Sequence, residues 1–396
     1  MDPLRLEEFR AAAENIRGRA VRTPLVRLNV DPETVNGVEI FLKVETLQPV
    51  GSFKIRGALH ACLSADPKLL QQGVWTASAG NMAQGVAWAA RLLGAKCSVA
   101  VPDNAPQGKV AAIRALGAEV IYVPRFEWFE FVIRGVPQSW MLNGLFIHPC
   151  SHREVMAGQG TIGLEILEDL PSANVVITPY GGGGLTGGVA SAVKLLSPEC
   201  RCWACELETG APLAPSLAAG APVDIIPTHA HAFAEGFSGS PTIIAELWPV
   251  MKQNLCGSAI VSVAELAAAV RLLVTRQHIV AEGAGAAALA AVMDGKVGAK
   301  PGDKVVCVVS GGHIDTGVLG EILDGVDTWD LNDRPVSGDG ASWELRLRLA
   351  WSAARKWGDR LHLSPAGVAF TPVLVGLGAG VGLGRMLGMR SAMARM

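Results

Sequence analysis

Four consecutive glycines between an apolar segment and a helix-like run constrain the fold of this chain more than any other feature. Residues 174–180 read as a buried strand, residues 181–184 are the glycines, and residues 189–196 have a helical pattern. Without Cβ atoms the loop can bring its backbone N–H groups against a phosphate, and the following helix dipole favours that charge. No Gly-Lys-Ser/Thr follows, which excludes a nucleotide P-loop, and the spacing fits a dinucleotide fingerprint poorly. The pattern predicts a strand–loop–helix unit that binds phosphate.

Strand-like and helix-like segments alternate along most of the chain. A capping box, Ser262 with Glu265, opens a helix that we expect to end near residue 276. Such alternation predicts parallel sheets with helices on both sides, an α/β fold. The 396 residues suffice for two domains, and a composition that is half apolar with 46 glycines suits strands buried on both faces. Further segments expected to be regular are the strands 39–44, 96–101, 119–123, 203–206 and 304–309 and the helix 107–116.

A lysine among small and apolar residues is the first candidate for a catalytic group. Lys54 lies in the segment GSFKIRG, residues 51–57, shortly after the strand-like residues 39–44. A poorly solvated lysine disfavours its ammonium form, so that its amine becomes available as a nucleophile. A Schiff base with an aldehyde cofactor requires such an amine. For an isolated Phe-Lys-Ile motif we would instead favour a lysine at a helix start with its ammonium group in solvent.

Two further loops have polar side chains where ligands commonly bind. Residues 78–81, SAGN, precede the helix-like run 86–93, and their serine hydroxyl and asparagine amide can add hydrogen bonds to those of the helix N-terminus. A simple capped helix start is the alternative. The strand 304–309 ends at Ser310 and two glycines. Ligands gather at such strand ends in open α/β sheets, although a plain β-turn would look the same.

Taken in order, these motifs resemble the fold-type II pyridoxal-phosphate enzymes, and within them the threonine/serine dehydratase and serine racemase family. The resemblance covers residues 5 to 325 and includes RTPL at 22–25, GQGTIGLE at 158–165 and AEGAG at 281–285. It implies a tryptophan synthase β-like α/β fold of two doubly wound domains with mostly parallel sheets. Residues 1–45 and 145–323 would form a large cofactor-binding domain, and residues 46–144 a small one.

The resemblance implies a role for each motif. Lys54 would carry pyridoxal 5'-phosphate as a Schiff base and Phe53 would pack against its ring. Asn81 would hydrogen-bond the 3'-oxygen, and Ser310 would face the pyridine nitrogen. The cofactor phosphate would be held by Gly181, Gly182, Gly183, Gly184 and Leu185, and the substrate carboxylate by Ser78, Ala79, Gly80 and Asn81.

The serine opposite the pyridine nitrogen bears on the type of reaction. A hydroxyl cannot protonate that nitrogen as a carboxylic acid would, so the ring is a weaker electron sink and β-elimination or replacement is favoured over transamination. The implied activity is that of an L-threonine/L-serine ammonia-lyase, which converts a small hydroxy amino acid to a 2-oxo acid and ammonia. The alternatives are an amino-acid racemase, a threo-3-hydroxyaspartate dehydratase, and a non-catalytic binding or regulatory protein that retains the fold.

Several positions depart from the family pattern. Met82 stands where histidine is usual, and His313 where asparagine is usual. Ala79 occupies the position of the serine that protonates the second face in racemases, so we expect racemisation to be weak. Glu206 matches one ligand of the family's divalent cation site, but Gly210 and Pro212 stand where oxygen ligands would follow. Because hard cations need several oxygens, no metal is expected.

Charge and cysteine content exclude other classes of protein. A net charge of −2 gives no reason to expect nucleic acid or an anionic membrane as a partner. Eight cysteines in so long a chain do not make a disulfide framework. Cys202 and Cys205 should point to opposite faces of a strand, so that these two and Cys200 form no zinc site. The N-terminus has no apolar signal region, and we expect a cytoplasmic homo-oligomer, a dimer or a tetramer.

Three parts of the chain receive only a general interpretation. Residues 126–145 are rich in Trp, Phe and Met and are expected to pack in a core, with the site entrance or an interface as alternatives. His229 and His231 are expected at the surface. The extension 324–396 is expected to be poorly ordered and does not resemble a regulatory domain. Its uncharged stretch 366–384 is long enough for a membrane segment but rich in glycine, so membrane attachment is a minor alternative.

Overall fold

The computed structural model describes residues 2–228, 232–234, 241–329 and 335–336. Contacts divide the chain into a first unit, Met1–Ala354, and a second, Arg355–Met396. The described residues do not include the second unit or most of the extension 324–396. They also do not include His229 and His231, so the expectations for these parts of the chain remain predictions.

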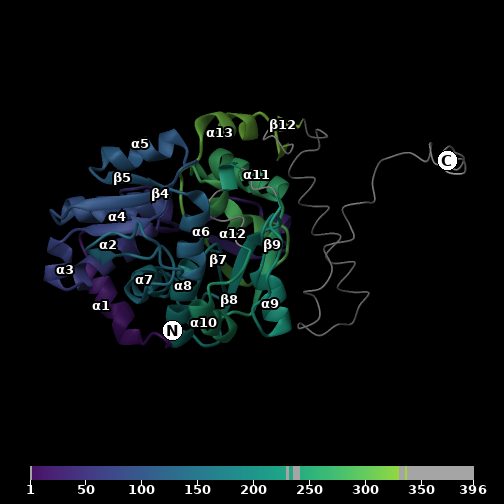
Figure 1. The fold of residues 1–396 in the computed structure, drawn as a ribbon. Helices are drawn as coiled ribbons and strands as arrows, with labels where there is room; N and C mark the ends of the chain where they lie inside the picture. The colour runs from purple at the N-terminus through teal and green to yellow at the C-terminus, as the bar shows by residue number, and fades with distance from the viewer. Residues whose placement is uncertain (1, 229–231, 235–240, 330–334, 337–396) are drawn as a thin grey trace, which may run out of the picture. The chain divides into compact units, whose positions relative to one another are not determined.

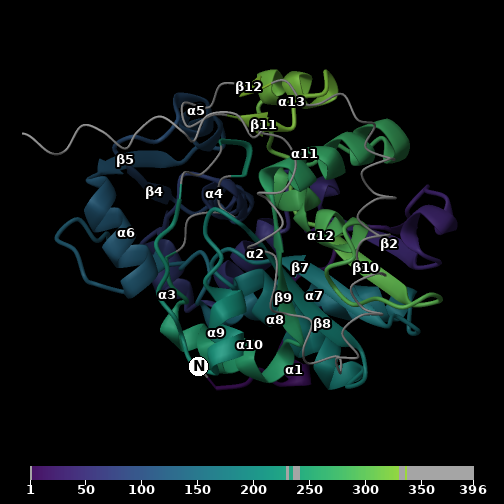
Figure 2. The same cartoon turned by 90° about the vertical axis from the view of Figure 1, so that its right-hand side faces the viewer.

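The larger sheet has six strands in the order β1-β2-β10-β7-β8-β9 (Figures 1 and 2). All neighbouring pairs are parallel except β1 with β2. Strand β10 lies between β2 and β7, so strands that are more than 250 residues apart in the sequence, β2 and β10, are neighbours in the sheet. Every residue of β7 is buried, as expected for a strand covered on both faces. The strands are β1 Leu25–Arg27, β2 Glu39–Val44, β7 Val175–Pro179, β8 Arg201–Leu207, β9 Gly257–Val261 and β10 Lys304–Val309.

The smaller sheet has four parallel strands in the order β5-β4-β3-β6 (blue in Figure 1). Its strands are β3 Val74–Ala77, β4 Cys97–Pro102, β5 Glu119–Val123 and β6 Leu145–Phe146. They lie in the sequence between β2 and β7, so this sheet is inserted into the larger one. The predicted α/β fold with mostly parallel sheets is confirmed, and the predicted strands agree with the observed ones within about two residues.

Helices cover both faces of each sheet. Alternate residues of a strand point to opposite faces, so they belong to different hydrophobic cores. In the larger sheet α7 and α8 pack on the face of Val306, and α11 and α12 on the face of Val305. In the smaller sheet α2, α4 and α5 pack on one face and α6 on the other. The helices are α1 Leu6–Ile16, α2 Lys54–Ser64, α3 Pro67–Gln71, α4 Asn81–Leu92, α5 Gln107–Ala115, α6 Arg125–Arg134, α7 Arg153–Asp169, α8 Gly184–Leu196, α9 Leu213–Ala219, α10 Trp248–Asn254, α11 Val263–Leu272, α12 Gly283–Met293 and α13 Thr316–Leu323.

Shorter elements complete the described chain. The capping box of Ser262 and Glu265 is present at the start of α11. That helix ends at Leu272 and continues as a π turn, Leu273–Gln277, which accounts for the predicted end near residue 276. The 3-10 turns are η1 Pro32–Val35, η2 Glu45–Leu47, η3 Ala232–Ala234 and η4 Ala245–Leu247, and β11 Thr328–Trp329 pairs with β12 Pro335–Val336.

The aromatic segment 126–145 divides between core and surface. Phe131, on α6, stacks on Trp75 with ring centroids 5.8 Å apart, and Trp140 meets Phe131 edge-on at 5.1 Å. Phe126, by contrast, is 74% exposed. Core packing is therefore confirmed for the middle of the segment and wrong for its first residue.

Helix α7 approaches α2 closely because glycines face each other. A Cβ atom on Gly158 would lie 2.6 Å from the backbone oxygen of Arg56, and one on Gly57 would lie 2.5 Å from Nε2 of Gln159. Real Cβ atoms do not approach other atoms so closely, so these positions accept only glycine at the observed helix separation. The first turn of α2, where Lys54 lies, is thereby held against α7.

Candidate active site

Lys54 is the first residue of α2 and is partly buried. Its Nζ donates a hydrogen bond of 2.8 Å to the backbone oxygen of Pro149 and lies 5.1 Å from the centroid of the Phe53 ring. Pro149 belongs to the loop that follows β6 of the smaller sheet. The side chain of Lys54 therefore crosses toward this loop, and its amine has a neutral acceptor as its partner.

The glycine loop 181–184 joins β7 to α8. The helix begins at Gly184, five residues before the predicted run, and its N-cap Gly183 has φ +91°. No side-chain hydrogen bond caps α8, so the N–H groups of its first turn are available to an anion, except that of Gly184, which faces the Cys150 thiol. A Cβ atom on Gly184 would lie 2.6 Å from the backbone oxygen of Cys150, which shows how closely that residue covers the loop.

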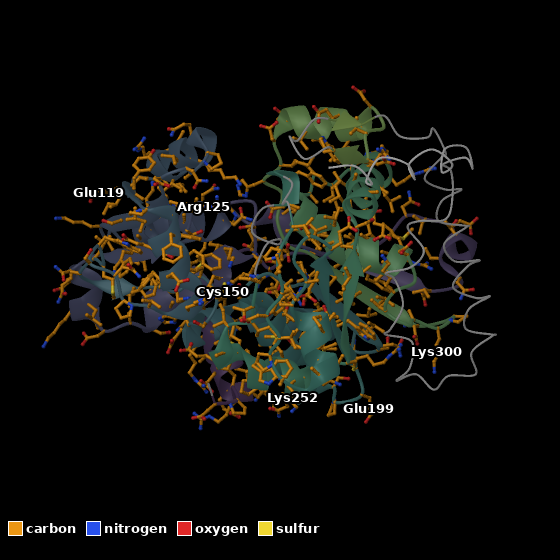
Figure 3. The ribbon with its side chains drawn as sticks, turned by 45° about the vertical axis from the view of Figure 1, so that its right-hand side comes forward. Glu119, Arg125, Cys150, Glu199, Lys252 and Lys300 are labelled. Carbon is orange, nitrogen blue, oxygen red and sulfur yellow. The ribbon has the colours of Figure 1, made fainter. Side chains whose placement is uncertain are left out.

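Cys150 lies against the glycine loop and directly follows Pro149, the residue that accepts the hydrogen bond from Lys54; Figure 3 shows Cys150 near the middle of the molecule. Burial raises the pKa of its thiol, against the effects of the nearby Lys54 charge and a hydrogen bond from the Gly184 backbone. Cys150 is not among the predicted site residues. The end of strand β6 at Phe146 is the available signal, because ligand-binding loops follow strand ends.

The loop 78–81 leads into α4, which begins at Asn81. Ser78 does not cap this helix; its Oγ accepts a hydrogen bond of 3.2 Å from the Gly80 N–H. Asn81 Nδ2 donates to Oε1 of Glu282 at 2.7 Å, across 201 residues of sequence. The simple capped helix start, the alternative considered for this loop, is therefore not what forms. Glu282 belongs to the motif 281–285, for which the sequence pattern suggests no role in the site.

The end of strand β10 connects these parts. The Ser310 carbonyl accepts a hydrogen bond of 3.0 Å from the Phe53 N–H, just before Lys54. The next carbonyl, of Gly311, accepts one of 3.0 Å from the Glu282 N–H. Ser52 also forms a backbone bridge with Gly311. The fold thus brings the lysine segment, the Asn81 loop and the Ser310 loop together. The loop with Pro149 and Cys150 contacts Lys54 through Pro149 and the glycine loop through Cys150.

The structure places Met82 and His313, two of the positions that depart from the family pattern, and the cysteines of strand β8. Met82 is buried in the core of the smaller sheet, where its side chain packs against apolar neighbours. His313 is exposed to solvent on one side and lies beside Gly51, with Cε1 3.2 Å from the position of a Cβ there. Partial desolvation, followed by the charge of Lys109, lowers the pKa of its imidazole. Cys202 and Cys205 belong to different cores, as the strand alternation predicts.

Glu206 satisfies its carboxylate within the protein. Its oxygens accept hydrogen bonds from the N–H groups of Leu213 at 2.7 Å and Ala214 at 2.9 Å, and from Oγ of Ser258 at 2.7 Å. Burial raises its pKa to about 7. In the described part of the chain no three His, Cys, Asp or Glu side chains are grouped as a metal site would require, and all eight cysteines are free thiols. None of the helices described there is long and apolar enough to cross a membrane.

Glu282 gives the unliganded protein a pH-dependent stability. Burial raises its pKa from 4.5 to about 7, against the Asn81 hydrogen bond and the charges of Lys109 and Lys54. A carboxyl group with a raised pKa contributes its stability fully below pH 4.5 and loses it as the pH rises through 7, by at most about 3 kcal/mol. We expect the urea midpoint to fall less steeply from pH 5 to 8 in Glu282→Gln than in the wild type. Equal slopes in the two proteins would contradict this assignment.

The chain matches the family model described as pyridoxal-phosphate dependent enzyme over residues 16–311. It belongs to this family. It is 38% identical over 322 residues to an L-threonine ammonia-lyase of Thermotoga maritima, covering 80% of this chain and 78% of the relative. It is 36% identical over 330 residues to the catabolic L-threonine dehydratase of Escherichia coli, covering 82% and 98%.

Solved structures give the same family. Maize serine racemase superposes with a TM-score of 0.72 at 30% identity, over 81% of this chain and 97% of that one. The processed form of threonine deaminase isoform 2 from Solanum lycopersicum superposes with a TM-score of 0.68 at 28% identity, over 80% and 93%. The fold-type II resemblance is thereby confirmed, and with it pyridoxal phosphate as the cofactor.

Proposed function

We propose that this protein is a pyridoxal-phosphate-dependent ammonia-lyase that acts on L-threonine and L-serine and releases a 2-oxo acid and ammonia. The observation that carries the proposal is the convergence of Lys54, the Asn81 loop and Ser310 in a chain of this family. The names of relatives that are 36–38% identical, L-threonine ammonia-lyase and dehydratase, support the choice of substrate.

Two structural features support the assignment of the cofactor's ligands. The uncapped start of α8 provides N–H groups for a phosphate at Gly181, Gly182, Gly183, Gly184 and Leu185, and the loop is too closely covered by Cys150 for side chains. The partly buried Lys54 is the amine that would hold the aldehyde, beside the ring of Phe53. Ser310 would present a neutral hydroxyl to the pyridine nitrogen. When bound, the cofactor supplies an electron sink for the bond that breaks at Cα.

The side chains of this chain then have the following tasks. The amine of Lys54 removes the Cα proton of the substrate and holds it, as a general base. The N–H groups and hydroxyl of Ser78, Ala79, Gly80 and Asn81 bind the substrate carboxylate and fix which Cα bond faces the lysine. Glu282 accepts one N–H of the Asn81 amide, which leaves the other N–H for the cofactor's 3'-oxygen. The β-hydroxyl takes up a proton, which the Lys54 ammonium can return, and leaves as water. The released enamine tautomerises to an imine, and water hydrolyses it to the 2-oxo acid and ammonia.

The proposal includes the division of the chain. Residues 1–45 and 145–323 would form the cofactor-binding domain, with the glycine loop and Ser310, and residues 46–144 the small domain, with Lys54 and the substrate loop. A cytoplasmic homo-oligomer, a dimer or a tetramer, is part of the same proposal. Light scattering of the purified protein would measure its mass, and a monomer would contradict this part.

Serine racemase activity is the second candidate, because two structures of serine racemases superpose with TM-scores of 0.72 and 0.69. A racemase needs an acid/base group on each face of Cα, and Ala79 offers no proton on the face opposite Lys54. We therefore expect that the protein converts L-serine to pyruvate much faster than it converts L-serine to D-serine. Chiral chromatography of the reaction mixture measures the D-serine formed. Equal rates would overturn the lyase proposal.

The variant Ala79→Ser tests the same argument in the opposite direction. It should raise the yield of D-serine, because the new hydroxyl can protonate the second face. An unchanged yield would mean that residues 78–81 do not lie against the substrate. A 2-oxo acid assay across threonine, serine, phenylserine and threo-3-hydroxyaspartate identifies the preferred substrate, and no turnover with any of them would favour the non-catalytic alternative.

A further inference from the structure

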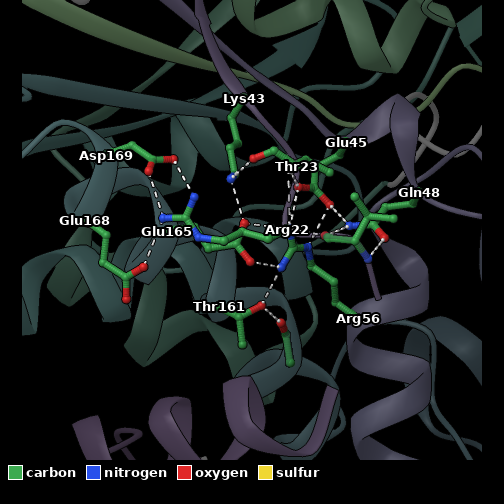
Figure 4. Close-up of polar contacts among 12 residues, drawn as sticks. Arg22, Thr23, Lys43, Glu45, Gln48, Arg56, Thr161, Glu165, Glu168 and Asp169 are labelled. Carbon is green, nitrogen blue, oxygen red and sulfur yellow. Dashed lines mark hydrogen bonds and ion pairs between the residues drawn. The ribbon is translucent and has the colours of Figure 1, made fainter. Parts of the chain in front are cut away.

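Four buried charges lie beside the first turn of α2 (Figure 4). The side chains of Lys43, Glu45 and Arg56 are fully buried, and that of Glu165 is 14% exposed. They come from four elements: Lys43 from β2, Glu45 from the 3-10 turn η2 that follows it, Arg56 from α2, and Glu165 from α7. We refer to these four residues as the Arg56 network.

The guanidinium of Arg56 is bound on two sides. Its Nε and Nη2 donate to the two oxygens of Glu45, each at 2.8 Å, and its Nη1 and Nη2 donate to those of Glu165 at 2.7 and 2.8 Å. Nη1 also donates to Oγ1 of Thr161 at 3.0 Å. Lys43 Nζ completes the network with hydrogen bonds of 2.6 Å to Glu165 and to the backbone oxygen of Thr23. Two bidentate pairs fix a guanidinium in position and in orientation.

Stability alone does not account for this arrangement. Burial disfavours all four charges, and well-packed apolar residues at such sites are often as stabilising as ion pairs. Arg56 also lies in the first turn of α2, where the helix dipole disfavours a positive charge. The Arg56 guanidinium nevertheless outweighs burial and holds the pKa of Glu45 below its usual value, so the carboxylate stays ionised. What the network provides is a defined geometry.

Arg56 and Lys54 point to opposite sides of the helix. Two residues along an α-helix correspond to a rotation of about 200°. The Arg56 network therefore holds one side of the first turn while the Lys54 side chain projects from the other toward Pro149. Rotation or sliding of α2 would break the bidentate pairs with Glu45 and Glu165.

We propose that Arg56 is a positioning residue: its bidentate pairs with Glu45 and Glu165 fix the rotation of the first turn of α2 and thereby the direction of the Lys54 amine. This inference rests on the proposed role of Lys54 as the cofactor-binding base. A misplacement of a reacting group by about 1 Å can cost 10²-fold in rate.

The test is Arg56→Lys, which keeps the charge but cannot form two bidentate pairs. We expect kcat to fall by about 10- to 100-fold with KM changed by less than about threefold. The visible circular dichroism of the bound cofactor should weaken, because the lysine is less fixed. In the cofactor-free protein, hydrogen exchange of the amides at 54–58 should accelerate by about tenfold or more.

Arg22→Lys is the matched control. Arg22 also binds α7, through Asp169 at 2.7 Å and Glu168 at 3.1 Å, but its side chain is exposed and outside the network. We expect wild-type kcat, dichroism and exchange for this variant. If Arg56→Lys folds and behaves like Arg22→Lys in all three measurements, Arg56 does not position the lysine.

A milder variant covers the case in which Arg56→Lys fails to fold. Thr161→Val removes the hydrogen bond that Arg56 donates to Oγ1 of Thr161 and the one that this Oγ1 donates to the Gly158 carbonyl, and it leaves every charge in place. This variant should accelerate hydrogen exchange of the amides at 54–58 and weaken the visible circular dichroism of the cofactor, both less than Arg56→Lys does. Wild-type values in both measurements would overturn the proposal. The exchange measurement needs neither cofactor nor substrate, so the inference can fail or hold independently of the proposed lyase activity.

Discussion

Replacing Lys54 with alanine is expected to lower kcat for 2-oxo acid formation by about 10³-fold or more, because both the attachment point of the cofactor and the general base are lost. Steady-state assays with threonine and serine measure this. The wild-type protein should be yellow, and borohydride should fix the cofactor to the peptide that contains Lys54. Label on another lysine, or no bound cofactor, would refute the assignment.

Lys252→Ala is the control for this experiment. Lys252 lies on α10, is exposed and donates to the backbone oxygen of Gly220 at 3.1 Å (Figure 3). The variant should keep wild-type kcat and the same borohydride label. A comparable loss in Lys252→Ala would mean that lysine substitutions act through general stability.

Gly183→Val should weaken cofactor binding by about 100-fold, equivalent to about 2.7 kcal/mol. At φ +91° a branched side chain is strained, and its Cβ would lie 3.1 Å from Leu247 and 3.2 Å from Tyr180. The loop must therefore shift, and the N–H groups at the start of α8 move away from the phosphate. Titration of the cofactor-free protein with pyridoxal phosphate measures the change.

Gly117→Val separates loss of the phosphate site from backbone strain. Gly117 has φ +90°, nearly the same as Gly183, and nothing lies within 4 Å of its Cβ position. Both variants should lose a few kcal/mol of stability from the strained backbone. Only Gly183→Val should lose cofactor affinity. If Gly183→Val retains wild-type occupancy, the glycine loop is not the phosphate site.

The sequence alone predicts much of this fold because its strands are marked by local patterns. The strands 39–44, 119–123 and 304–309 are predicted with their observed bounds, since a strand buried on both faces is a short apolar run between turns. The capping box at Ser262 is equally local. The four motifs and their order also identify the family and its cofactor, which the comparisons confirm.

The parts of the site that depend on contacts between distant residues follow from the three-dimensional fold and not from local patterns. The helices α4 and α8 begin at Asn81 and Gly184, earlier than their patterns suggest. Their first turns contain asparagine or glycines, which have weak helix propensity, so packing sets the conformation there. Lys54 meets Pro149 across 95 residues, Asn81 meets Glu282 across 201, and Arg56 meets Glu165 across 109. No local pattern encodes such pairs. They form because the inserted sheet brings α2 and α4 against the strand ends of the larger one, and hydrogen bonds between buried polar groups then select the partners.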